Sequence, residues 1–128
     1  MSKNYLRLAL VFAMLAVILG AFGAHALKKV LSEYQLGIYE TGVRYQFYHA
    51  LGMLAPFVLR EYIPAKFCKF ASIFFTIGIL LFSGSLYLLA CSDMIGLENK
   101  SIVGPLTPIG GVFLILGWGS LFFGTFRK

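Results

Sequence analysis

The residues that could do chemistry in this 128-residue chain are polar side chains inside or beside long apolar segments. A polar group in lipid is costly when it stands alone, whereas several that converge can form a binding site. These groups supply hydrogen-bond donors and acceptors, a guanidinium and two imidazoles, which is the chemistry of ligand recognition. The candidate ligand-binding residues are His25, Arg44, Tyr45, Gln46, Tyr48, His49, Ser83, Ser85 and Tyr87.

Helical spacing orders the residues of the second apolar segment. Tyr45 and His49 are four positions apart, as are Arg44 and Tyr48, so a helix would present them as two adjacent polar stripes. His49 would lie about 7–8 Å deeper along the helix axis than Arg44. We expect an imidazole at that depth to face protein or a water-filled cavity and not lipid.

Structural roles compete with ligand binding at each of these positions. Arg44 could be an interface anchor whose charged head reaches toward water. The tyrosines suit interface or packing roles, and Ser83 and Ser85 can bond to their own helix backbone. Histidines in membrane helices also satisfy hydrogen bonds between helices.

Catalysis and metal binding have little support in the sequence. No Asp or Glu lies in the apolar segments, so acid–base work would rest on two histidines and the tyrosines. A Ser-His-Asp arrangement needs an orienting carboxylate, and two histidines without cysteine or carboxylate partners make an incomplete metal site. We therefore expect a protein that is not an enzyme and that holds no metal and no cofactor.

Four apolar segments must position these residues: Leu8–Ala24, Val43–Leu59, Phe70–Cys91 and Ile109–Phe126. A hydrocarbon core about 30 Å thick needs roughly 17–25 such residues per helix, and backbone groups in lipid must bond within their own segment. With 59% hydrophobic and 12% charged residues, the chain leaves no room for a second, water-soluble domain. The sequence predicts an all-α integral membrane protein, a single domain over 1–128 with four transmembrane helices in a compact bundle. The expected spans are about 6–26, 43–60, 69–91 and 107–126.

The stretch between the first two spans, 27–42, is amphipathic. Leu27 and Leu31 share a helical face, with charged residues on other faces. Ser32 and Gln35 match a capping box, which marks the start of a helix. We expect a short amphipathic segment here that lies at the membrane interface.

Small residues and a proline indicate how the spans pack. Gly110, Gly117 and Gly124 repeat every seven residues in the last span. Because lipid gives helices no hydrophobic drive to associate, close approach through small residues must contribute. Pro56 should release the carbonyl of Gly52 and kink the second span.

The net charge of +6 falls on one side of the predicted bundle. With four spans, the two termini and the second loop share that side, while the charges of the other side sum to zero. Lys and Arg gather in cytoplasmic loops, which predicts that both termini are cytoplasmic. The basic side should attract anionic headgroups, and a nucleic-acid role is left without support. Ala24-His25-Ala26 imitates a secretory cleavage site, but the apolar stretch before it is longer than most signal cores, so we expect an uncleaved first span.

Four sequence blocks carry a family resemblance: Gly20–Leu27, Tyr39–Leu51, Leu81–Tyr87 and Leu106–Gly111, within a match from about Gly20 to Trp118. They resemble the domain-of-unknown-function 423 family, also called uncharacterised protein family 0382. That family includes the YgdD-like inner-membrane proteins, and an animal relative is called transmembrane protein 256. The resemblance implies a small four-span membrane protein, mostly bacterial, and it brings no established activity, substrate or catalytic residues.

We therefore expect a multi-pass protein of the bacterial inner membrane whose polar cluster, in the outer leaflet, binds a small polar or lipid-headgroup ligand. Its partners would be the lipid bilayer and the anionic headgroups of the cytoplasmic face, and the chain could also form a homo-oligomer. One alternative is a small oligomeric transporter or channel, for which the inner halves of the spans offer only Ser72 and Thr76. Another alternative is a membrane scaffold or assembly partner.

Overall fold

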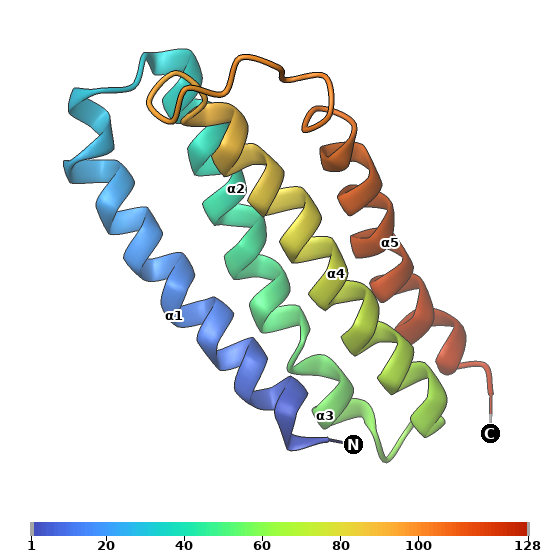
Figure 1. The fold of residues 1–128 in the computed structure, drawn as a ribbon. Helices are drawn as coiled ribbons and strands as arrows, with labels where there is room; N and C mark the ends of the chain where they lie inside the picture. Colours follow the sequence, from blue (N-terminus) through green and yellow to red (C-terminus); the bar gives the residue numbers. More distant parts are fainter. Residues whose placement is uncertain (1, 128) are drawn as a thin grey trace.

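Long antiparallel helices make up the protein, and both termini lie at the same end of the molecule (Figure 1). The structure is a computed structural model that describes residues 2–127, and within them it contains helices and no strands. We call the end opposite the termini, which holds the α1–α2 and α4–α5 connections, the distal end. The elements are α1 (Lys3–His25), η1 (Leu27–Lys29), α2 (Glu33–Gly52), α3 (Ala55–Leu59), α4 (Ala65–Ala90) and α5 (Leu106–Gly124).

Three stretches of the described residues are long and apolar enough to cross a membrane. They are Lys3–Lys29, Ala65–Ala90 and Leu106–Gly124. The prediction of an all-α membrane fold is confirmed. The helix α2 has 20 residues, but glutamate, arginine, glutamine and histidine side chains make it the most polar of the long helices.

A capping box starts α2 well before the apolar part of the helix. Ser32 Oγ accepts a hydrogen bond from the Gln35 backbone N–H at 3.2 Å, and Gln35 Oε1 accepts one from the Ser32 N–H at 3.0 Å. Gln35 Nε2 also donates to Asp93 Oδ2 of the α4–α5 connection at 2.7 Å. The amphipathic stretch 27–42 is thus divided between η1 and the first turns of α2, so the second long helix begins at Glu33 and not near Val43.

The Ser32→Ala variant is expected to lower the stability of the fold by about 1 kcal/mol, because it removes half of the capping box. Denaturant titration of purified protein in detergent micelles, followed by helical circular dichroism, measures this loss. Ser120→Ala is the matched control, since the Ser120 hydroxyl is exposed and bonds only to the Leu116 carbonyl of its own helix. Equal stability of the two variants would contradict a stabilising role for the cap.

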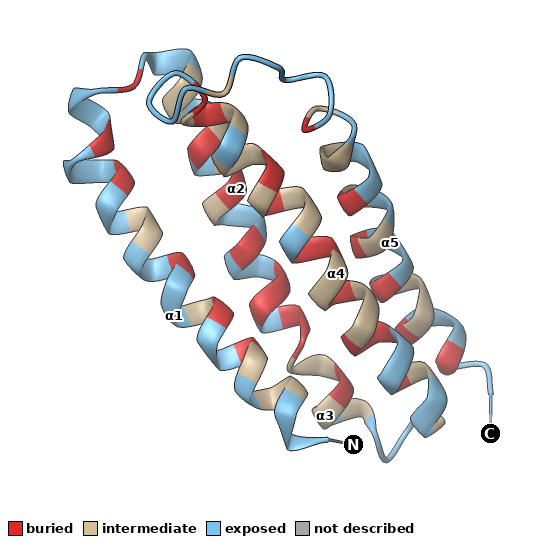
Figure 2. Ribbon diagram, in the orientation of Figure 1, coloured by how far each residue is buried: buried red, intermediate tan, exposed pale blue. Residues whose placement is uncertain are grey.

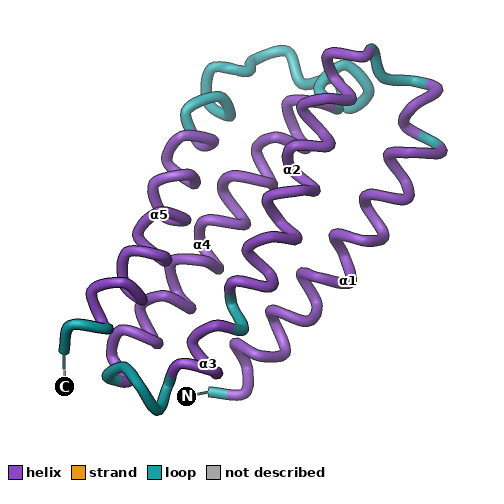
Figure 3. The backbone as a smooth tube through the Cα atoms, turned by 180° about the vertical axis from the view of Figure 1, so that it is seen from behind, coloured by secondary structure: helices purple, strands orange, loops and turns teal. Residues whose placement is uncertain are grey.

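Pro56 interrupts the second span, as its sequence position predicts. The helix α2 ends at Gly52, and Pro56 lies in the first turn of α3, where its missing N–H leaves no helical bond unmade. The break is visible as a loop between the two helices in Figure 3. The second crossing of the bundle is therefore built from α2 and the short α3.

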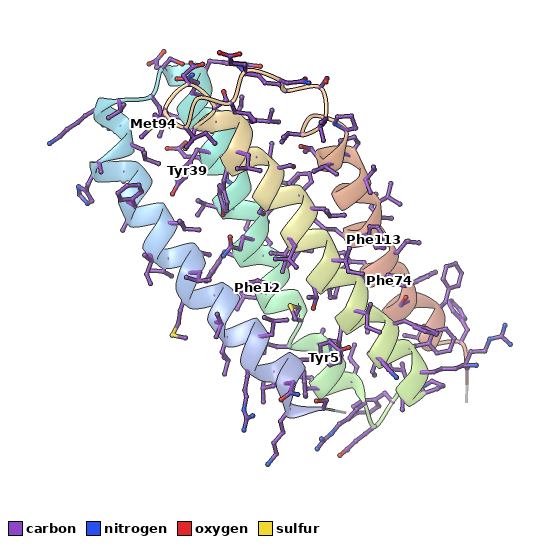
Figure 4. The ribbon with its side chains drawn as sticks, viewed as in Figure 1. Tyr5, Phe12, Tyr39, Phe74, Met94 and Phe113 are labelled. Atoms are coloured by element: carbon purple, nitrogen blue, oxygen red, sulfur yellow. The ribbon has the colours of Figure 1, made fainter. Side chains whose placement is uncertain are left out.

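The helices pack in the order α1, α2, α4, α5 (Figures 1 and 3). Buried positions follow the facing sides of neighbouring helices, and much of α1 and α5 is exposed (Figure 2). The core between them includes Met53, Cys68 and Phe75. Where α4 meets α5, Phe74 and Phe113 lie with ring centroids 6.0 Å apart (Figure 4).

The heptad glycines of α5 form the seam with α4. Gly110, Gly117 and Gly124 are all buried. A Cβ atom added at Gly117 would lie 2.5 Å from Cδ1 of Phe75, so the ring occupies the space that glycine leaves open. The prediction that these glycines allow close helix packing is confirmed.

Candidate functional site

Gln46 supplies the one amide side chain of the predicted site and is buried, with 4% of its surface exposed. Its Nε2 donates to the Phe12 carbonyl of α1 at 2.9 Å. Its Oε1 accepts a hydrogen bond from the Tyr87 hydroxyl of α4 at 2.6 Å. One side chain of α2 therefore connects the two helices that flank it, and its amide has a partner on both sides.

Tyr39 packs beside the Gln46–Tyr87 bond and is not among the residues predicted from the sequence. Tyr39 is labelled in Figure 4. Its hydroxyl donates to the Leu19 carbonyl of α1 at 2.6 Å, and the centroid of its ring lies 5.3 Å from that of Tyr87. A Cβ added at Gly23 would lie 2.5 Å from Tyr39, and one added at Gly42 would lie 2.8 Å from Tyr87. Helical spacing is the sequence feature that points to Tyr39, because position 39 shares the inward face of α2 with positions 42, 46 and 49.

Two serines of α4 join it to the neighbouring helices. Ser83 Oγ donates to the Gly42 carbonyl of α2 at 2.7 Å. Ser85 Oγ lies 2.6 Å from Thr107 Oγ1 of α5 and also donates to the Phe82 carbonyl at 2.9 Å. Both serines are buried, and their hydroxyls connect α4 to α2 and to α5.

His49 faces α5, away from the Gln46–Tyr87 bond. Its Nδ1 bonds to the Tyr45 backbone carbonyl at 2.8 Å. The imidazole is surrounded by the rings of Tyr45, Phe75 and Trp118, with centroid distances of 5.9, 5.7 and 6.0 Å. A groove of about 300 Å³ runs past this imidazole between α2 and α5.

The remaining predicted residues are exposed. His25 lies at the end of α1, and Arg44 and Tyr48 lie on the outer face of α2. Arg44 and Tyr48 line a groove between α1 and α2, with a volume of about 270 Å³.

The structure therefore does not bring the predicted residues into one cluster. Gln46, Ser83 and Ser85 each form hydrogen bonds between helices. Two separate grooves lie elsewhere, one beside Arg44 and one beside His49. The predicted residues are separated because of how α2 is oriented about its own axis: Gln46 and His49 face inward, and Arg44 faces outward. His25 joins neither groove.

Comparison with known proteins places the chain in a family. The profile described as "Protein of unknown function (DUF423)" matches residues 19–111. The chain belongs to the DUF423 family. A UPF0382 membrane protein of Haemophilus influenzae is 39% identical over 128 residues, which cover 100% of this chain and 98% of that protein.

Other DUF423 relatives cover nearly the same length. The UPF0382 membrane protein YwdK of Bacillus subtilis is 39% identical over 123 residues, covering 91% of this chain and 90% of that protein. The UPF0382 inner membrane protein YgdD of Escherichia coli K12 is 36% identical over 126 residues, covering 98% of this chain and 92% of that protein. No solved structure gives a significant match. The family assignment agrees with the resemblance, and this DUF423 protein is a multi-helix membrane protein that contacts the lipid bilayer.

Proposed function

We propose that this DUF423 protein is a non-enzymatic protein of the bacterial inner membrane that holds one anionic phospholipid in the groove between α1 and α2. The observation that carries the proposal is Arg44, a cation on an outward face of a membrane helix, at the rim of an apolar groove. Arg44 and Tyr48 are exposed, and they take no part in the hydrogen bonds of Gln46, Ser83 and Ser85.

The groove has the chemistry of a lipid site. Ala16, Val17, Val43 and Phe47 form its apolar walls, which suit an acyl chain. The Arg44 guanidinium presents planar donors that match the oxygens of a phosphate group. A phospholipid is an abundant membrane molecule that carries both an acyl chain and a phosphate group.

The depth of Arg44 strengthens the case. Arg44 lines the groove with Val17 of α1, and Val17 lies roughly 12 Å below the distal end of that helix, at a rise of about 1.5 Å per residue. A hydrocarbon core is about 30 Å thick, so the backbone of Arg44 would lie within it. A charge at such a depth is costly unless the side chain reaches the headgroups or an anion comes to it.

The charge distribution supports an orientation for this site. The excess of Lys and Arg beside the termini favours a cytoplasmic position for both of them. The distal end and Arg44 would then belong to the outer leaflet. The basic face at the termini would contact anionic headgroups of the inner leaflet without a built pocket.

A lipid-binding measurement tests the proposal. Purified protein is stripped of lipid, titrated with phosphatidylglycerol or phosphatidylcholine, and examined by native mass spectrometry. We expect one tightly held phosphatidylglycerol, and Arg44→Gln should weaken its binding about tenfold, since a charge-assisted bond contributes about 1.5–3 kcal/mol.

Two variants control for charge. Lys29→Gln removes a cation from the same end of the molecule and should leave the tight lipid in place. Glu40→Gln removes the exposed acid one turn before Arg44 and should strengthen binding, because a carboxylate competes with the phosphate for the guanidinium. Equal binding by Arg44→Gln and the unmodified protein would refute the proposal.

An oligomeric transporter or channel has weaker support. In the halves of the spans near the termini, the hydroxyl groups that it could use are Ser72, Thr76 and Ser120. Ser120 Oγ already donates to the Leu116 carbonyl of its own helix at 2.9 Å. Ser72 Oγ donates to the Cys68 carbonyl at 3.0 Å, and Thr76 Oγ1 donates to the Ser72 carbonyl at 2.8 Å. Both hydroxyls are therefore engaged by the backbone of α4, which makes them poor groups for lining an aqueous path.

A further inference from the structure

We propose a second binding site at His49, where a lipid-soluble aromatic molecule with a hydroxyl group, of the phenol or quinol class, occupies the groove between α2 and α5. This site is separate from the Arg44 groove and does not depend on the function proposed above. The two grooves have no lining residue in common.

The bonding of His49 determines which group a ligand must offer. A backbone carbonyl only accepts hydrogen bonds, so the contact of His49 Nδ1 with the Tyr45 carbonyl at 2.8 Å requires a proton on Nδ1. In the neutral ring, Nε2 then carries the lone pair and acts as an acceptor. No described residue contributes a hydrogen bond to Nε2. A ligand that satisfies this nitrogen must therefore bring a donor.

His49 is a buried polar side chain beside a groove, with only 7% of its surface exposed. The groove has a volume of about 300 Å³, and it is lined by Tyr45, His49, Phe82, Gly111, Leu114, Ile115 and Trp118. Since an apolar cavity of about 150 Å³ can hold benzene, this groove can hold an aromatic ring with substituents. Ile115 and Trp118 of its lining are exposed on the apolar outer surface of α5, so the groove opens toward the bilayer, which is the natural source of such a molecule.

The groove walls favour a ring over a flexible chain. Tyr45, Phe82 and Trp118 offer ring faces and edges, and aromatic pairs gain energy beyond simple burial. The rings of Tyr45 and Phe82 are 4.9 Å apart, and His49 meets Trp118 edge-on. An aromatic hydroxyl compound can contact these rings while its O–H donates to Nε2.

Trp118 reports on the site directly, because it is the only tryptophan in the chain and it lines the groove. The test uses the full chain in nanodiscs and two probes: a bromine-labelled dodecylphenol, and the same molecule with its hydroxyl methylated. Bromine quenches indole fluorescence on contact, and the two probes are compared at equal concentrations in the lipid. We expect the phenol to reach half-maximal quenching at about fivefold lower concentration than the ether, which is the effect of one net hydrogen bond.

Two variants separate a donor-specific site from simple partitioning into lipid. His49→Phe keeps a ring but removes the acceptor, so the phenol and the ether should quench it alike. Gly111→Leu should weaken quenching by both probes, because its side chain would extend along the groove. A Cβ added at Gly111 would lie 3.7 Å from the Phe82 ring, an ordinary contact, so this variant is expected to fold.

Each outcome decides the proposal. A phenol preference that disappears in His49→Phe, with quenching by both probes reduced in Gly111→Leu, supports it. Equal quenching of the unmodified protein by phenol and ether overturns it. If His49→Phe fails to fold, Gly111→Leu still decides, because unchanged quenching of that variant by the phenol would show that the ring binds elsewhere.

Discussion

Replacing Gly110 with alanine is expected to destabilise the bundle by about 3 kcal/mol, the upper part of the range for overpacking a well-packed core. The added Cβ would clash with the backbone N of Phe82 and would lie 2.8 Å from its Cα. Backbone atoms cannot rotate away as a side chain can, so α4 and α5 must move apart. That movement weakens the most extensive helix pair in the molecule. Denaturant titration in detergent micelles, followed by circular dichroism, measures the loss.

Gly119→Ala is the matched control for this prediction. It makes the same change on the same helix, but no atom lies within 4 Å of the added Cβ. Alanine is the better helix former by about 1 kcal/mol, so this variant should be as stable as the unmodified protein or more stable. If Gly110→Ala and Gly119→Ala unfold at the same denaturant concentration, the α4–α5 seam does not depend on glycine.

The helices and their seams could be predicted from the sequence because each has a local signal. The seven-residue spacing of Gly110 and Gly117 marked the face of α5 that packs on α4, and Pro56 marked the break in the second span. The start of α2 was harder to predict, because Glu33 and Glu40 make the first turns of this helix too polar to resemble part of a membrane span. The capping box at Ser32 marks the residue at which α2 begins. The polar residues around it favoured a separate interfacial segment over the first turns of a long helix.

The candidate site was harder to predict because the rotation of α2 decides it. Arg44 and His49 lie on stripes that are both polar, and nothing in the pattern says which stripe faces protein. The spacing of Tyr39 with Gln46 and His49 places it on their face of α2, but the pattern does not show that its hydroxyl bonds to the backbone carbonyl of Leu19. The sequence gives the types of polar group and their approximate depth, whereas their partners depend on packing between helices.

The Gln46→Leu variant is expected to lose about 2 kcal/mol of stability, because an unpaired buried polar group costs about 1–3 kcal/mol. The change removes the acceptor of the Tyr87 hydroxyl and also the donor to the Phe12 carbonyl. Denaturant titration in detergent micelles measures the loss. Tyr48→Phe removes an exposed hydroxyl from the same helix, where 53% of the side chain is accessible, and should change stability little.

A double-mutant cycle isolates the bond between Gln46 and Tyr87. Tyr87→Phe removes the donor alone, and the double variant should lose less stability than the two single variants together. The expected coupling is about 1 kcal/mol, within the range for hydrogen bonds between membrane helices. Strictly additive losses would mean that this bond contributes nothing. A positive coupling would identify Gln46 and Tyr87 as structural residues of the bundle, in which case variants at Arg44 and His49 should alter ligand binding while leaving this coupling unchanged.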